Sequence, residues 1–133
     1  MFTCYCGLLK SYQDCCGPYI DAGGLPLSPE ALMRSRYSAY AQAKVDYIVE
    51  TMRGAALEGF DPVEAKAWAE RVEWLGFIVL KARYSVRNSN KAQVEFKAYY
   101  REGNVEQCLH ELSDFERLQG RWFYTSGKKP LVH

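Results

Sequence analysis

The cysteines constrain this sequence most, because four of the five lie within residues 4–16, in the stretch CYCGLLKSYQDCC. They follow the spacing C-x-C, eight residues, then C-C. Four thiolates can enclose one zinc ion tetrahedrally, and a segment this short has no apolar core that would fold it without a metal. The spacing therefore predicts a zinc site. Its expected ligands are Cys4, Cys6, Cys15 and Cys16.

Other arrangements of these thiols explain the spacing less well. Two disulfides would need an oxidising compartment, and the adjacent Cys15 and Cys16 could join only in a strained bridge. Four unrelated thiols would be reactive groups without a structural or chemical role. A catalytic zinc needs an open coordination position, which four sulfur ligands do not leave unless one of them is labile. A structural zinc is the favoured interpretation.

The composition is that of an ordinary globular domain and argues against several function classes. The 133 residues are 48% hydrophobic and 25% charged, with a formal net charge of +1. This length suggests one domain, and the scattered charges offer nucleic acid no basic patch. No apolar run reaches the roughly 20 residues that cross a bilayer. The opening MFTCYCGLLK lacks the features of a signal peptide, so a cytoplasmic location is expected.

Residues 17–72 alternate turn signals with helical periodicity. The stretch GPYIDAGGLPLSPE is rich in glycine and proline and predicts a linker. Ser28 and Asp61, each followed by proline, predict the starts of two helices. Between them a further helix is predicted over 45–52, and RGAALEGF is expected to end it. On the first of these helices, Arg34 is expected to face water.

After about residue 73 the apolar residues change from helical to alternating periodicity. WLGFIVLKARYSV, AQVEFKAYYRE, VEQCLHELSDFERL and RWFYTS are rich in β-forming residues, and turn signals separate them. The third stretch fits helix or strand by itself, and its place between two hairpin turns favours strand. Three helices followed by four antiparallel strands predict an α+β fold. In this fold a curved, cone-shaped sheet packs on the helices and leaves a pocket.

Three stretches of the sequence resemble a known family. CYCGLLKSYQDCC is similar to the SEC-C motif, a zinc knuckle close to C-P-C-G-S-G-x-x-Y-x-x-C-C; the four cysteines and Gly7 match, whereas Leu8 and Leu9 replace Ser-Gly. GPYIDAGGLPLSPEALMRSRYSAYAQAKVDYIVET and HELSDFERLQGRWFYTSG resemble the YchJ family, which joins such a knuckle to a SnoaL-like, nuclear-transport-factor-like domain. The resemblance implies a zinc knuckle over residues 1–20 and a cystatin-like α+β domain over residues 28–127.

Aromatic residues are numerous enough to line much of a pocket in such a cone, since the chain has ten tyrosines, six phenylalanines and three tryptophans. Core packing is the plainer interpretation of each, and Asp46 could instead cap a helix or pair with Arg36. His110 and Glu111 are neighbours in a strand and so point to opposite faces. The lone Cys108 is expected to be buried. The candidate pocket residues are Tyr37, Tyr40, Asp46, Tyr47, His110, Glu111, Trp122 and Tyr124.

Two functions fit these features, and a binding module is favoured over an enzyme. A zinc-binding adaptor or ligand-binding protein would contact a protein partner through the knuckle or a small molecule through the pocket. A small isomerase, dehydratase or hydrolase would instead use acid–base groups such as Asp46, His110 and Tyr40. No catalytic motif supports the enzyme. A homodimer through the open sheet faces is also left open, and nucleic-acid and membrane partners are not expected.

Overall fold

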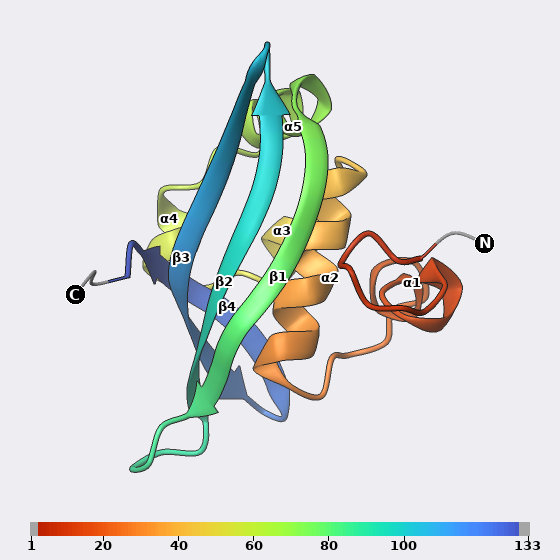
Figure 1. Cartoon of the computed structure of the whole chain (residues 1–133). Helices are drawn as coiled ribbons and strands as arrows, with labels where there is room; N and C mark the ends of the chain where they lie inside the picture. The colour runs from red at the N-terminus through yellow and green to blue at the C-terminus, as the bar shows by residue number, and fades with distance from the viewer. Residues whose placement is uncertain (1–2, 131–133) are drawn as a thin grey trace.

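The computed structural model describes residues 3–130, in which a four-stranded antiparallel sheet curves beside one long helix (Figure 1). The strands lie in the sheet in chain order, so each pairs with the next through a hairpin. No helix in the described part of the chain is long and apolar enough to span a membrane. The elements are the 3-10 helix η1 (Tyr12–Asp14), helices α1 (Gly17–Ile20), α2 (Pro29–Ala41), α3 (Val45–Glu50), α4 (Ala55–Glu58) and α5 (Pro62–Arg71), and strands β1 (Glu73–Tyr84), β2 (Lys91–Glu102), β3 (Val105–Leu118) and β4 (Arg121–Lys128).

The α+β fold, its three longer helices and all four strands confirm the prediction from the sequence. At the start of α2, Ser28 Oγ accepts a hydrogen bond of 3.0 Å from the backbone N–H of Ala31. At the start of α5, Asp61 Oδ1 accepts from the N–H groups of Val63 and Glu64 at 3.0 and 3.2 Å. Both caps satisfy N–H groups that have no partner inside the helix. The two caps therefore fix where these helices begin.

Two short helices differ from the prediction. Helix α1 lies in the stretch predicted as a linker, where the N–H groups of Tyr19 and Ile20 donate to Cys16 O. Helix α4 lies in RGAALEGF, where the N–H of Leu57 donates to Gly54 O. Each is a single turn, which is too short to give the sequence a helical period.

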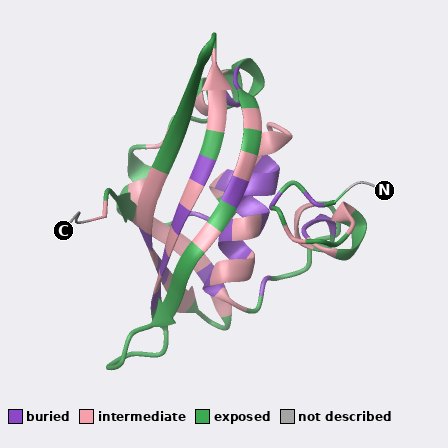
Figure 2. Cartoon of the chain, viewed as in Figure 1, coloured by how far each residue is buried: buried purple, intermediate pink, exposed green. Residues whose placement is uncertain are grey.

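The inner face of the sheet packs against α2 and forms the main core. Along β2 every second side chain, from Ala92 through Val94 and Phe96 to Ala98, is buried against the helix (Figure 2). Phe96 pairs with Glu111 across the β2–β3 ladder, which places the Glu111 side chain on the same inner face. Register shifts in β1 and between β3 and β4 bend the sheet around the helix.

The outer face of the sheet carries polar side chains. His110 Nε2 lies 2.7 Å from Glu95 Oε2 on this face, so its neighbour Glu111 points inward as strand alternation predicts. Cys108 is exposed, so the prediction that it is buried is wrong. The sequence prediction fails there because VEQC lies in the part of β3 that projects beyond the core, where the residues 105–109 are all exposed.

We expect Asp61→Ala to lower the free energy of unfolding by about 1 kcal/mol, because it removes the side-chain cap of α5. Asp46→Asn is the matched control, since Asp46 is exposed and α3 has no side-chain cap. It should change the same quantity by less than about 0.5 kcal/mol. Urea denaturation followed by circular dichroism measures both variants. Equal losses would show that the Asp61 cap contributes nothing.

Candidate functional site

The four cysteines of the N-terminal knuckle converge on one point. The Sγ atoms of Cys4, Cys6, Cys15 and Cys16 all lie within 4.8 Å of one another. Cys15 Sγ is 3.6 Å from Cys6 Sγ and 4.0 Å from Cys16 Sγ. A tetrahedral zinc site with Zn–S bonds of ~2.3 Å separates its sulfurs by about 3.8 Å. The thiols, all of them free, therefore fit one tetrahedral metal ion.

Backbone turns bring these sulfurs together. The N–H of Cys4 donates to Lys10 O at 2.7 Å, and the N–H of Gly7 donates to Cys4 O at 3.1 Å. The N–H of Cys15 donates to Tyr12 O at 3.1 Å and closes η1. Gly7 has φ of +93°, in the left-handed region that glycine enters without steric cost. The two halves of the motif thus fold back toward each other.

The clustered thiols influence each other's protonation. The hydrogen bond from the Cys16 thiol lowers the pKa of Cys6, and the same bond raises the pKa of Cys16. Burial is the largest cause that raises the pKa of Cys15. One thiolate forms readily, and its neighbours resist a second negative charge. A divalent cation would remove that resistance, because thiols release their protons when they coordinate a metal.

The knuckle is attached to the rest of the protein through α2. Cys4 Sγ lies 3.5 Å from Ser38 Oγ, and Arg34 Nη1 donates a hydrogen bond of 3.0 Å to Cys6 O. Arg34 also forms a salt bridge of 3.0 Å with Glu30 one turn earlier on the same helix. The sequence predicted that Arg34 faces water, but its guanidinium instead contacts the knuckle. It holds a positive charge beside the sulfur cluster.

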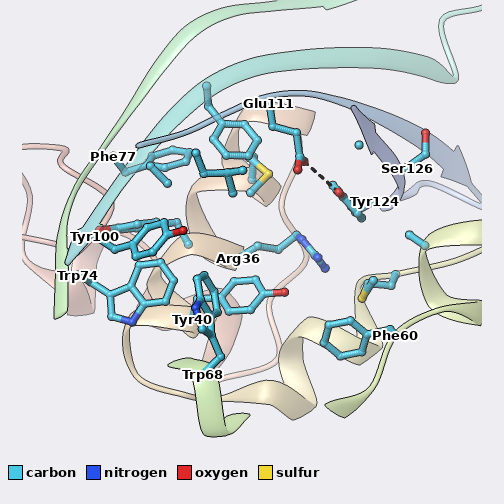
Figure 3. Close-up of a pocket in the computed structure, with 18 of the residues that line it drawn as sticks. Arg36, Tyr40, Phe60, Trp68, Trp74, Phe77, Tyr100, Glu111, Tyr124 and Ser126 are labelled. Carbon is cyan, nitrogen blue, oxygen red and sulfur yellow. Dashed lines mark hydrogen bonds between the residues drawn. The ribbon is translucent and has the colours of Figure 1, made fainter. Parts of the chain in front are cut away.

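A second candidate site is a cavity of about 470 Å³ between α2 and the inner face of the sheet (Figure 3). Aromatic side chains gather at one end, and Arg36, Glu111 and Tyr124 lie at the other. The volume falls within the roughly 300–1,000 Å³ typical of small-molecule sites. The aromatic lining comes from α2, α5, β1 and β2 and includes Tyr37, Tyr40, Trp68, Trp74, Phe77 and Tyr100.

Tyr40 and Tyr124 are two of the four tyrosines that line this cavity. Burial raises the pKa of Tyr40 and of Tyr124, so both hydroxyls keep their protons at neutral pH. The Tyr124 hydroxyl donates a hydrogen bond of 2.9 Å to Glu111 Oε2. The cavity therefore combines an apolar wall with a small number of fixed donors and one carboxylate.

The eight predicted pocket residues fall into two groups. Trp122 is buried in the core, where its ring centroid lies 5.7 Å from that of Tyr84. Tyr47 is buried elsewhere, with its hydroxyl 2.7 Å from Ser35 Oγ. His110 lies on the outer face of the sheet. The residues that do line the cavity are Tyr37, Tyr40, Glu111 and Tyr124.

Asp46 also lies away from the cavity, and neither structural interpretation of it is correct. It is exposed in the first turn of α3, whose N-cap residue is Lys44. Arg36 does not pair with it, because Arg36 Nη1 instead donates to Ile48 O at 2.9 Å and Thr51 Oγ1 at 2.6 Å. The sequence placed Asp46 correctly in the first turn of a helix, but Asp46 lies on the exposed side of that turn, whereas Val45 and Tyr47 are buried.

Several lining residues escaped the sequence analysis. Arg36 lies three residues after Met33 and four before Tyr40, so helical spacing puts it on the buried side of α2, and that spacing was an available signal. Trp68 and Trp74 come from α5 and β1, and their ring centroids lie 5.1 Å apart. No local pattern indicates that these rings meet, because the packing of α5 on the sheet brings them together.

Comparison with known proteins places this architecture among its relatives. The family model described as YchJ, middle NTF2-like domain, matches residues 28–127. A UPF0225 protein of Shewanella sp. (strain MR-4) is 42% identical over 131 residues, covering 94% of this chain and 79% of the relative. A UPF0225 protein of Geobacter sulfurreducens is 35% identical over 124 residues, covering 93% of this chain and 77% of the relative.

Two solved structures have the same fold over nearly the whole chain. The solution structure of a SEC-C motif containing protein from Rhodopseudomonas palustris matches with a TM-score of 0.86 and 41% identity, covering 97% of this chain and 99% of that chain. The crystal structure of a SEC-C motif containing protein from Psychrobacter arcticus matches with a TM-score of 0.81 and 30% identity, covering 100% of this chain and 85% of that chain.

We expect Gly7→Ala to loosen the knuckle from the sheet, because a Cβ at this position would lie 3.0 Å from Phe77 O of β1. Gly23→Ala is the matched control, since Gly23 also has a positive φ (+78°) but no atom within 4 Å of its added Cβ. Backbone strain should lower the free energy of unfolding by about 1 kcal/mol in each variant. The contact with Phe77 O should lower it further in Gly7→Ala alone. Urea unfolding measures the difference. Equal losses would show that the contact with β1 does not hold the knuckle.

Proposed function

The chain belongs to the YchJ family, and we propose that it is a ligand-binding protein whose N-terminal knuckle is held together by one structural zinc ion. The observation that carries the ligand-binding proposal is the cavity of about 470 Å³ between α2 and the sheet. Apolar and aromatic side chains line most of it, and a few polar groups converge at one end. Proteins bind small molecules in concavities built in this way.

The zinc part of the proposal rests on the chemistry of the four thiols. Soft thiolate ligands in a tetrahedral arrangement suit zinc, whereas magnesium and calcium prefer oxygen ligands. Cys4, Cys6, Cys15 and Cys16 would hold the ion. Four sulfurs would leave no position for water, so the ion would fold the segment rather than activate a substrate. The SEC-C motif named for both structural relatives agrees with this role.

An adaptor and an enzyme are weaker proposals. An adaptor that binds protein through the knuckle would leave the open cavity without a role. Of the two leucines in the knuckle, Leu8 packs against the cysteines, and only Leu9, which is 91% exposed, is available to a partner. The acid–base enzyme would need Asp46, His110 and Tyr40 in one site. Tyr40 lines the cavity, whereas Asp46 is exposed on α3 and His110 lies on the outer face of the sheet. Ligand binding requires only the groups that converge on the cavity, such as Tyr40 and Glu111.

We expect the purified protein to contain one zinc ion per chain, measured by inductively coupled plasma mass spectrometry. Cys15→Ser should lower the zinc content and unfold the knuckle while leaving most of the sheet folded, which backbone amide NMR signals report. Cys108→Ser is the matched control, because Cys108 is an exposed thiol outside the cluster. Full zinc content in Cys15→Ser, or no zinc in the unmodified protein, would contradict the proposal.

The cavity should bind the apolar dye Nile red at one saturable site, seen as an increase in its fluorescence. Ala98 and Ala92 are both buried on the inner face of β2, but only Ala98 lines this cavity. Ala98→Leu should therefore weaken dye binding, because the larger side chain occupies the site. Ala92→Leu should leave dye binding unchanged. Non-saturable binding, or equal effects of the two variants, would argue against a ligand site here.

A further inference from the structure

Arg36 is a buried cation that forms no salt bridge with a carboxylate among residues 3–130. Its side chain is 2% exposed and lines the cavity between α2 and the sheet. Nη1 donates to Ile48 O and Thr51 Oγ1, and the guanidinium carbon lies 4.4 Å from the centre of the Tyr124 ring. Among the described residues, Nε has no hydrogen-bond partner. An unpaired buried donor is costly, and Nε is sealed inside the protein. The nitrogen left for an acceptor in the cavity is Nη2, which makes no hydrogen bond within residues 3–130.

Glu111 places a carboxylate at the same end of the cavity. Its Oε2 accepts hydrogen bonds from Ser113 Oγ at 2.5 Å and Tyr124 Oη at 2.9 Å. Gly127 makes room for this arrangement, because a Cβ there would collide with both Tyr124 Oη and Glu111 Oε2. Within residues 3–130, no hydrogen bond ends on Glu111 Oε1. This oxygen is therefore the acceptor that a ligand in the cavity would meet.

The two charged groups point toward one space and do not pair with each other. Figure 3 shows Arg36, Tyr40 and Glu111 directed toward the interior between the aromatic cluster and Tyr124. No salt bridge joins Arg36 and Glu111 in the part of the chain that the structure describes. The charges sum to zero at this end of the cavity. This end therefore offers a hydrogen-bond donor and a hydrogen-bond acceptor to the same cavity.

The opposite end of the cavity is a wall of aromatic rings. Trp74 lies within 6.0 Å, between ring centroids, of Tyr40, Trp68 and Tyr100. Trp68 packs edge-on against Tyr100 at 5.2 Å. Rings that brace each other in this way keep a fixed apolar surface. An aromatic ligand would gain stacking and edge contacts there in addition to its hydrophobic burial.

We propose that the cavity binds a neutral aromatic amide, which places its rings on the Trp68–Trp74–Tyr100 wall and its amide group between Arg36 and Glu111. The amide oxygen accepts from the Arg36 guanidinium, and the amide N–H donates to Glu111 Oε1. The class includes cyclic amides, in which the C=O and N–H lie side by side. This inference rests on the proposed ligand-binding function and adds the chemistry of the ligand.

The two opposite charges favour an amide over an ion. A carboxylate ligand would gain from Arg36 but would meet the negative charge of Glu111, and an ammonium ligand would meet the opposite conflict with Arg36. A hydrocarbon would leave the guanidinium and the carboxylate without partners and would also remove them from water. The amide satisfies both groups and brings no net charge into the cavity.

Three compounds of equal ring size test this chemistry: 2-naphthamide, 2-naphthoate and 2-methylnaphthalene. Binding is followed by NMR through the indole N–H signals of Trp68 and Trp74, with Trp122 as the internal control because it does not line the cavity. In the unmodified protein, 2-naphthamide should bind about tenfold more tightly than either of the others. In Glu111→Gln, 2-naphthoate should gain affinity and 2-naphthamide should lose its advantage, because the negative charge is removed and a donor takes its place.

The change of order within one folded variant makes the test independent of protein stability. Equal binding of all three compounds would overturn the amide proposal and leave ligand binding intact. Tightest binding of 2-naphthoate, or the same order in Glu111→Gln as in the unmodified protein, would also overturn it. If none of the compounds shifts Trp68 or Trp74 and Nile red does not bind either, the proposed function fails as well.

Discussion

In the proposed zinc site, the fold of the knuckle depends on four sulfur atoms that would share one positive ion. Around Cys4, Cys6 and Cys16, further apolar contacts come only from Leu8, Tyr12, Cys15 and Ile20 among the described residues. Burying such a side chain contributes about 1.5–3 kcal/mol, whereas a structural zinc contributes roughly 10–16 kcal/mol in small zinc domains. Metal coordination is therefore the interaction large enough to order a segment with almost no core.

Helix α2 connects the cysteine cluster to the cavity. One side of the helix contacts the knuckle through Arg34 and Ser38, and another side presents Arg36 and Tyr37 to the cavity. A close-packed helix transmits displacement on one side to the other, because its interior has few voids to absorb it. The zinc knuckle would therefore support a wall of the ligand site while lying outside it.

The sequence predicted the fold and the clustering of the four cysteines well, because both follow from local patterns. Ser28 and Asp61 mark helix starts by their own hydrogen bonds, and the alternation along β2 is continuous. The cavity could be predicted only in part. Tyr40 and Glu111 followed from helical and strand periodicity, whereas Trp122 and Tyr47 share that periodicity and are packed elsewhere. The packing of helices on a sheet decides which end of the sheet stays open. This packing cannot be predicted from a short stretch of sequence.

Zinc K-edge X-ray absorption of the purified protein tests the central claim most directly, because it reports the number, type and distance of the atoms bound to the metal. The account predicts four sulfur ligands at ~2.3 Å and no nitrogen or oxygen in the first coordination shell. A first shell with nitrogen or oxygen ligands would contradict a closed structural site formed by Cys4, Cys6, Cys15 and Cys16. So would a spectrum without zinc, from protein whose four thiols are joined as disulfides.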